Sequence, residues 1–185
     1  MINIIIYIVL GLLLIALMYL IVTYNSFIKL RNLVAEAFAT MDVYLKKRWD
    51  LIPNLVEVVK GYAKHESNLL ESVVSLRSSA YDKMSVDDKI NTNERLSAEI
   101  VRLFAVAENY PDLKASQNFL DLSAQLSKIE DEIAQSRKYY NAVVRDMNTK
   151  VEMFPSNLVA GIFGFKCLKM FEVQGEERAN VKIEL

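Results

Sequence analysis

The feature that most constrains this chain is an apolar segment at its N-terminal end. Residues Ile4 to Val22 form an unbroken apolar run, and the first charged side chain of the sequence is Lys29. As an α-helix the run would be about 28 Å long, enough to cross the hydrocarbon core of a bilayer. A signal peptide would begin with basic residues and have a shorter apolar core, and a buried helix would normally be shorter or amphipathic. Residues 1–24 are therefore predicted to be a retained single-pass membrane anchor.

The charges that follow this segment predict its orientation. Lys29, Arg31 and the basic run at residues 46–48 lie on its C-terminal side, whereas no Lys or Arg precedes it. Because basic flanks stay in the cytoplasm, the N-terminus should be extracytoplasmic and the rest of the chain cytoplasmic. The single cysteine, Cys167, allows no intramolecular disulfide, which agrees with a reducing compartment. We therefore expect a single-pass protein of the cell membrane.

Residues 25–153 have the pattern of a helical bundle. Gly61 is their only glycine, and Pro53 and Pro111 are their only prolines, so a turn-rich β structure is not expected. Apolar residues recur at intervals of three and four, the period of a buried helix face. The stripes are Phe27, Leu30, Val34, Phe38, Met41, Leu45 and Ile52; Leu55, Val59, Tyr62, Leu69, Val73, Leu76 and Ala80; Leu96, Ile100, Leu103, Ala107 and Tyr110; and Leu122, Leu126, Ile129, Ile133, Tyr140, Val143 and Met147. The sequence thus predicts an all-α protein with an antiparallel four-helix bundle.

Local chemistry predicts where these helices are interrupted. Pro53 lacks a backbone donor and disfavours helical geometry at the residue before it, so a turn or a sharp kink is expected at residues 50–53. The polar residues 85–94 have the composition of a loop followed by a helix start. Pro111 and Asp112 indicate a tight break, with the proline just past one helix and the aspartate early in the next.

The C-terminal tail, residues 154–185, differs from the bundle. Its first part, Phe154 to Phe165, is apolar, rich in aromatic residues and broken by two glycines. It is expected either to pack back over the bundle or to form a surface for a partner, a neighbouring copy or the bilayer. Residues 175–180 have the composition of a polar linker, and residues 181–185 alternate in a way that fits a short strand.

The residues needed for catalysis are not assembled in this sequence. His65 is the only histidine, which excludes the H-E-x-x-H zinc motif and other sites with two imidazoles. Cys167 lies in the apolar tail without an activating neighbour. Residues 161–166 lack the G-K-[ST] ending of a P-loop. We therefore expect no enzyme, no cofactor and no metal ion.

The charge balance argues against a nucleic-acid partner. Lys and Arg number 22 and Asp and Glu 23, for a formal net charge of −1. The one dense basic run, residues 46–48, lies between Asp42 and Asp50. It can be a solvated helix face, or it can contact anionic lipid near the membrane.

Several segments, in order along nearly the whole chain, resemble the LemA family of bacterial membrane proteins. The resemblance is strongest at residues 42–56 (DVYLKKRWDLIPNLV) and 60–66 (KGYAKHE). The other matching segments are the anchor with residues 24–25 (YN), residues 30–32 (LRN), 105–115 (AVAENYPDLKA), 118–119 (NF), Arg137, 139–141 (YYN) and the 154–165 tail. Residues 167–170 (CLKM) depart from the family, where a more polar, proline-containing stretch is common.

This resemblance implies a single-pass membrane protein, N-terminus out, with a cytoplasmic four-helix bundle and no known enzymatic activity. Some relatives are linked to membrane shaping or organelle biogenesis. Family genes often accompany membrane-protease genes, which implies a role in envelope maintenance.

Two groups of residues are the expected interaction sites. The first group lies where the bundle should turn. A structural role is favoured for it, and binding is the alternative. There Asn54 should cap free backbone donors and Arg48 should pair with Glu57. The second group lies in the tail. The two groups are Arg48, Trp49, Asp50, Pro53 and Asn54; and Phe154, Ile162, Phe163 and Phe165.

The leading hypothesis is a membrane-anchored structural protein that self-associates and organises or remodels the bacterial cytoplasmic membrane. Anchoring confines the copies to a plane and raises their effective concentration, so weak contacts through the tail and the bundle faces suffice. The alternative is an adaptor or regulator of a membrane protease or sensor. The expected partners are the lipid bilayer, further copies of the chain and, for the alternative, that protease or sensor.

The predicted topology can be tested by cysteine labelling. Ser78→Cys or Asp88→Cys, in a Cys167→Ser background, should be shielded from a membrane-impermeant thiol reagent in intact cells, because both positions should be cytoplasmic. Labelling before lysis would reverse the predicted orientation.

Overall fold

The computed structural model describes residues 1–75 and 81–171, and every regular element within these ranges is helical, which confirms the all-α prediction. The elements are α1 (Ile2–Tyr62), α2 (Ser67–Ser75), the 3-10 turn η1 (Tyr81–Lys83), α3 (Val86–Ala107), α4 (Pro111–Lys114), α5 (Gln117–Glu152) and α6 (Ser156–Phe163). The expected linker at 175–180 and strand at 181–185, with Leu76, Ser78 and Ala80, lie outside the described residues.

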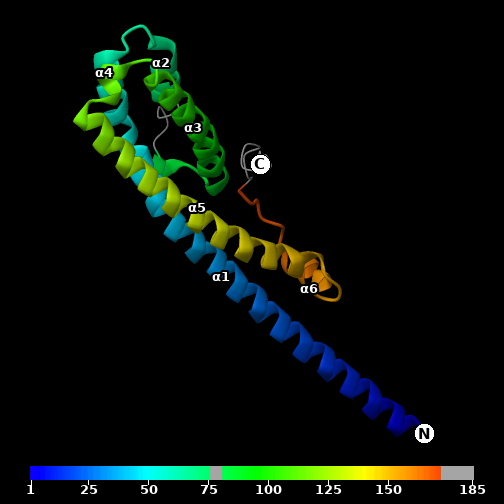
Figure 1. Ribbon diagram of the computed structural model, residues 1–185. Helices are drawn as coiled ribbons and strands as arrows, with labels where there is room; N and C mark the ends of the chain where they lie inside the picture. Colours follow the sequence, from blue (N-terminus) through cyan, green and yellow to red (C-terminus); the bar gives the residue numbers. More distant parts are fainter. Residues whose placement is uncertain (76–80, 172–185) are drawn as a thin grey trace, which may run out of the picture. The chain divides into compact units, whose positions relative to one another are not determined.

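The chain divides into two compact units, each built on a part of the long helices α1 and α5 (Figure 1). The first unit contains residues 1–39 and 138–170, and so holds the N-terminal part of α1, the end of α5 and all of α6. The second contains residues 40–137 and Phe171, with the remainder of α1, the beginning of α5 and the elements between them.

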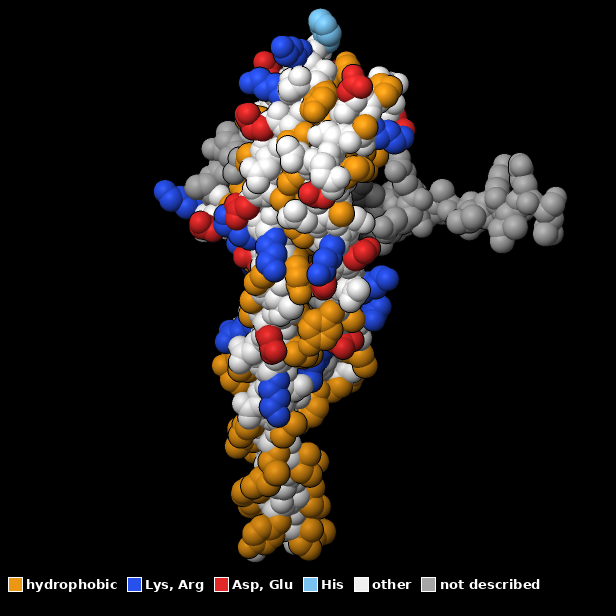
Figure 2. All heavy atoms as spheres, turned by 60° about the vertical axis from the view of Figure 1, so that its left-hand side comes forward, with side chains coloured by type: hydrophobic (Ala, Val, Ile, Leu, Met, Phe, Trp, Pro, Cys, Tyr) orange, Lys and Arg blue, Asp and Glu red, His pale blue; other side chains and the backbone are white. Residues whose placement is uncertain are grey.

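In the first unit, the apolar N-terminal segment of α1 is exposed. The side chains of residues 2–22 are exposed except for half-buried Leu20, and Figure 2 shows hydrophobic side chains without charged ones at this end of the helix. Among the described helices, α1 alone is long and apolar enough to cross a membrane. Exposed apolar surface of this extent is rare on soluble proteins, so the segment fits a lipid environment.

Beyond residue 22, the first unit has a core of its own. Of the predicted stripes, Phe27 and Val34 on α1 and Tyr140, Val143 and Met147 on α5 are buried. Ala37 and Val144, outside those stripes, are buried as well. The Phe38 and Tyr140 rings meet edge to face with centroids 5.9 Å apart. The Lys150 ammonium hydrogen-bonds the Ser26 hydroxyl and lies 5.6 Å above the Phe27 ring. The end of α5 therefore packs antiparallel along α1. We call these two packed segments of the first unit the hairpin.

The core of the second unit also follows the predicted stripes. Its buried residues include Met41, Leu45, Ile52, Leu55 and Val59 on α1, Val73 on α2, Leu96, Ile100, Leu103 and Ala107 on α3, and Leu126 and Ile133 on α5. Leu122 and Ile129 of the α5 stripe are half-buried. The helices thus pack through most of the expected positions, whereas Tyr62 of the predicted stripe is exposed near the end of α1.

The turn expected at residues 50–53 is absent, and that alternative is wrong: α1 continues through Pro53 to Tyr62. A proline inside a helix costs about 3 kcal/mol because it removes one hydrogen bond and crowds the preceding turn. Here Ile52, Leu55 and Val56 are buried on either side of it, and each contributes about 2 kcal/mol by leaving water. Burial of the flanking residues therefore outweighs the local penalty, and the chain turns only after Tyr62.

The helix start expected within residues 85–94 is confirmed, and it comes at the beginning of that stretch. Ser85 caps α3 by accepting a hydrogen bond from the Asp88 amide at 3.2 Å, and residues 86–94 are already helical. The break at Pro111 is confirmed, because α3 ends at Ala107 and Pro111 begins α4 with Asp112 in its first turn. The local cap at Ser85 was thus a better indicator than the polarity of the residues that follow it.

The buried seam of α5 can be tested by mutation. Ile133→Ala should lower the free energy of unfolding by roughly 2–5 kcal/mol, because Ile133 is fully buried and the substitution leaves a cavity. Lys128→Ala, on the exposed side of the same helix, should change it by less than about 0.5 kcal/mol. Denaturant unfolding followed by circular dichroism measures both, and equal effects would mean that the seam is misassigned.

Candidate functional site

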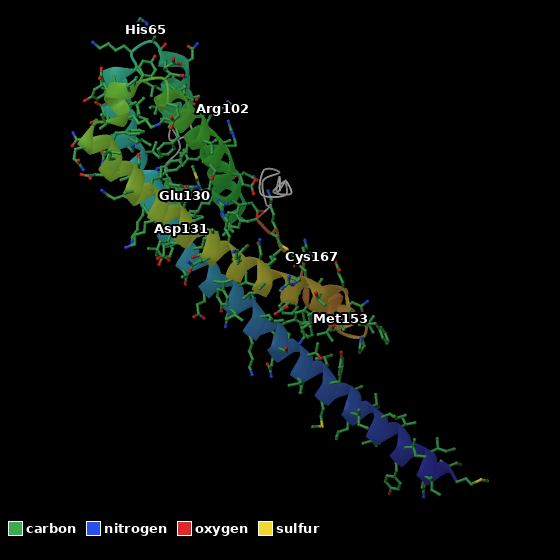
Figure 3. All side chains as sticks on the ribbon, in the orientation of Figure 1. His65, Arg102, Glu130, Asp131, Met153 and Cys167 are labelled. Carbon is green, nitrogen blue, oxygen red and sulfur yellow. The ribbon has the colours of Figure 1, made fainter. Side chains whose placement is uncertain are left out.

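The most buried charge of the second unit is the guanidinium of Arg48 on α1. Its side chain is fully buried, whereas that of Glu130 on α5 is 36% exposed. Arg48 Nη1 donates to both carboxylate oxygens of Glu130, at 2.7 and 2.9 Å, and to Ser97 Oγ at 2.8 Å. Figure 3 shows Glu130 on α5. One nitrogen thus joins α1 to both α3 and α5.

The second terminal nitrogen of Arg48 is used in the same way. Arg48 Nη2 donates to the backbone oxygen of Asn93 at 3.0 Å and to its side-chain oxygen at 2.8 Å. Asn93 is itself buried, and its amide donates to the Lys89 carbonyl at 2.8 Å. Of the three nitrogens of this guanidinium, only Nε has no hydrogen-bond partner within the described ranges. With both terminal nitrogens occupied, this arginine is arranged to hold helices together and offers little to a ligand.

The expected ion pair between Arg48 and Glu57 is wrong. Both residues lie on the unbroken helix α1, and Glu57 is exposed while Arg48 is buried. The pairing assumed a turn at Pro53 that would have brought Glu57 back towards Arg48. The sequence offers one weak indication of a true partner. Asn93 lies one turn before Leu96, on the helix face that Leu96 and Ile100 share, so it is a polar residue at a core position.

A second polar cluster surrounds Tyr81. The Tyr81 hydroxyl donates to Asp42 Oδ1 at 2.6 Å, and Lys89 Nζ donates to Asp42 Oδ2 at 2.7 Å. The ring of Tyr81 lies 5.3 Å from that of the buried Trp49. Burial and the neighbouring Asp42 carboxylate raise the pKa of Tyr81 well above its usual range, so the phenol stays protonated as a donor. This cluster accounts structurally for Trp49.

The remaining predicted residues of this segment lie on the outside of α1. Asp50 is exposed and forms an ion pair with Lys46 at 2.8 Å, one turn earlier. Asn54 is exposed in the middle of the helix, so the expected capping role is wrong: no helix begins there. Pro53 is half-buried. The structure therefore separates a buried face, with Arg48 and Trp49, from an outer one.

The tail forms a third candidate site, in the first unit. The ring of Phe165 stacks on that of Phe27 at 4.6 Å, and the ring of Phe163 lies 4.7 Å from that of Tyr24. Gly164, with φ of 73°, ends α6 in the left-handed conformation that favours glycine, and the Phe165 amide donates back to the Ala160 carbonyl at 2.9 Å. This reversal returns the chain to α1.

Not all of the tail packs inwards. Val159 and Ala160 of α6 are buried, whereas Phe154 is 77% exposed and Ile162 is 69% exposed. The expected packing of the tail onto its own chain thus holds for Phe165, whereas Phe154 and Ile162 remain exposed.

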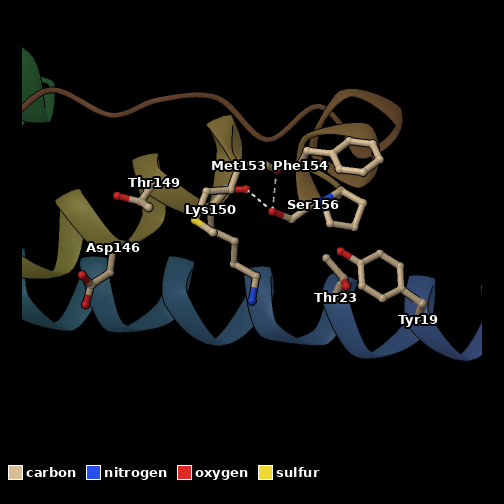
Figure 4. A pocket seen from close by; sticks show the side chains of 9 residues that line it. Tyr19, Thr23, Asp146, Thr149, Lys150, Met153, Phe154 and Ser156 are labelled. Atoms are coloured by element: carbon tan, nitrogen blue, oxygen red, sulfur yellow. Dashed lines mark hydrogen bonds between the residues drawn. The ribbon is translucent and has the colours of Figure 1, made fainter.

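A cleft of about 480 Å³ lies where α6 meets α1 (Figure 4). Tyr19 and Thr23 of α1 line one side, and Lys150, Phe154 and Ser156 line the other. Ser156 Oγ donates to the carbonyls of Lys150 and Met153, which fixes the turn between α5 and α6. The cleft adjoins the end of the apolar segment at Val22.

The groups most often used in catalysis are dispersed. His65 lies exposed between α1 and α2, and Cys167 lies exposed after α6 (Figure 3). Partial desolvation and the Glu152 carboxylate raise the pKa of the Cys167 thiol, which opposes nucleophilic activation. Within the described ranges, no three His, Cys, Asp or Glu side chains are grouped as metal ligands.

The role of the buried arginine can be tested with a double-mutant cycle. Glu130→Ala should destabilise the protein by about 3 kcal/mol, because it leaves the buried charge with neutral acceptors only. Arg48→Met combined with Glu130→Ala should be more stable than Glu130→Ala alone, since no buried charge then remains. Asp131→Ala, at the adjacent exposed position, should change stability by less than about 0.5 kcal/mol. In denaturant unfolding, a double mutant no more stable than Glu130→Ala alone would contradict the coupling.

Comparison with known proteins identifies relatives of this chain. A protein named LemA from Metamycoplasma hominis is 26% identical over 159 residues, which cover 85% of this chain and 72% of that protein. The magnetosome protein MamQ 2 of Paramagnetospirillum magneticum is 24% identical over 179 residues, covering 83% and 66%. The magnetosome protein MamQ of Magnetospirillum gryphiswaldense is 22% identical over 178 residues, covering 82% and 65%. The chain thus spans just under two thirds of the length of these two magnetosome proteins.

The model of the LemA family matches residues 37–185. The match begins within α1, after the apolar segment, and includes the residues of the Arg48 cluster and the tail. Together with the exposed apolar segment of α1, these similarities identify the chain as a membrane-associated member of the LemA family.

Proposed function

We propose that this protein is a non-enzymatic structural protein of the bacterial cytoplasmic membrane. Copies are anchored by one span each, with the N-terminus outside and the helical domain in the cytoplasm. They associate with one another in the membrane plane and thereby organise or remodel it.

The observation that supports this proposal best is the continuity of α1 within the first unit. The helix passes from the exposed apolar residues 2–22 into the packed hairpin with α5 without a break. A hinge between anchor and domain would let the domain move independently of the bilayer. An unbroken helix instead couples the hairpin directly to the apolar segment, which supports a role in membrane organisation.

The distribution of charge supports the cytoplasmic placement of the hairpin. Lys29 and Arg31 on α1, and Lys166 and Lys169 after α6, are exposed in the first unit. Basic residues close to a span favour the cytoplasmic side and attract anionic lipids. The similarity to relatives named as magnetosome proteins agrees with a role at a membrane.

Self-association follows from the physics of anchoring. A span confines each copy to two dimensions with a common orientation, which raises the effective concentration of every lateral contact. Contacts between spans and between the adjoining hairpins then suffice for assembly, although each would be weak in solution.

The second candidate function, an adaptor or regulator of a membrane protease or sensor, has one observation in its favour. In the second unit, the end of α1 and α2 enclose a cleft of about 620 Å³. Val56 and Leu70 supply an apolar floor, and Glu57, Lys60 and Lys64 supply charged walls. A groove of this kind suits an amphipathic helix of a partner.

Self-association can be tested in native membranes. Two copies of the full-length chain with different tags, expressed together at low level and extracted with their surrounding lipid, should copurify. A variant with residues 4–22 replaced by leucine keeps the anchor but loses the specific surface of the span, and it shows whether the hairpins alone sustain the contact. A single copy per extracted particle for the native chain would overturn the proposal and favour the adaptor.

A further inference from the structure

We propose that the outer face of α6 lies in the cytoplasmic headgroup region of the bilayer, beside the span of its own chain. The face comprises Met153 and Phe154 of the preceding turn with Leu158 and Ile162 of α6. This inference rests on the proposed anchoring of α1, and it assigns a lipid partner to a surface that the hairpin leaves uncovered.

The first argument is the composition of this segment. No charged side chain occurs between Glu152 and Lys166. Met153, Leu158 and Ile162 are each more than half exposed, while Val159 and Ala160 are buried against the hairpin. Leu158 and Ile162 are four residues apart and so share one face of the helix. One side of α6 is thus fixed to protein, and the other is apolar and bare.

The second argument is the position of α6 along α1. The apolar run ends at Val22, and a helix of that length matches the hydrocarbon core, so residues just after it lie among the headgroups. Phe163 contacts Tyr24, and Phe154 lines the cleft shared with Tyr19 and Thr23 (Figure 4). These contacts hold α6 within about one helical turn of the lipid boundary.

The third argument is the charge around this face. Lys29, Arg31, Lys166 and Lys169 are exposed in the same unit. The exposed acidic residues of that unit, Glu36, Asp146 and Glu152, are fewer. An apolar face beside basic side chains is the pattern of helices that lie in the interface of anionic membranes.

A second copy of the chain fits this face less well. The eight residues of α6 span about 12 Å, and only one side of the helix is free. By itself, a strip of this length offers far less than the roughly 800 Å² that each partner contributes to a stable protein interface, so a second copy would need further contacts elsewhere. Lipid requires no such area, because the bilayer is already held against the helix by the adjoining span.

The inference can be tested with spin labels on the full-length protein, reconstituted in vesicles of equal parts phosphatidylcholine and phosphatidylglycerol. Leu158→Cys and Ile162→Cys are made singly in a Cys167→Ser background. Leu13→Cys in the span and Asp88→Cys in the second unit serve as lipid and water references, and circular dichroism checks that each variant keeps its helix content. All four positions are exposed, so the labels leave the core intact.

We expect the labels at 158 and 162 to relax several-fold faster with oxygen than with a water-soluble nickel chelate, as the label at 13 does. The opposite order, matching the label at 88, would overturn the inference while leaving the anchor in place. Protection from both reagents, with spin–spin broadening that disappears on dilution with unlabelled protein, would assign the face to a second copy and also overturn it. If the label at 13 itself fails to report lipid, the proposed anchoring fails instead.

Discussion

The buried charge of Arg48 is the interaction on which the packing of the second unit depends. Apolar helix faces tolerate sliding and rotation at small cost, but a guanidinium in the core must find its acceptors or remain uncompensated. Those acceptors come from Asn93 and Ser97 on α3 and Glu130 on α5. We infer that Arg48 sets the register of three helices. The role of the family segment at residues 42–56 is therefore primarily structural.

The first unit uses a different means to join its parts. Its tail returns to α1 through aromatic rings, with Phe165 stacked on Phe27 and Phe163 against Tyr24. Stacking of this kind binds without charge and tolerates proximity to lipid, where an ion pair would be costly to desolvate. Aromatic contacts thus hold the part of the chain closest to the apolar segment, and a charge holds the part farther along the sequence.

The sequence predicted much of this fold because apolar periodicity reports directly on burial. The stripes through Met41, Leu103 and Ile133 are buried as expected. The errors arose where a local signal was overruled by packing. Pro53 looked like a turn, yet buried neighbours keep it within α1, and Arg48 was paired with Glu57 because of that assumed turn. Partners 45 and 82 residues away cannot be read from spacing along one helix.

The two helices of the hairpin in the first unit are far apart in the sequence, and this separation constrains the order of events during synthesis and folding. Ser26 and Lys150, which hydrogen-bond across it, are 124 positions apart in the chain. At about 5 to 20 residues per second, the ribosome makes the α5 partner on the order of 10 s after α1. During that interval the apolar segment can already enter the bilayer while Phe27 and Val34 still lack their cover. With α1 anchored as proposed, the hairpin is therefore completed only after its apolar segment has had time to reach the bilayer.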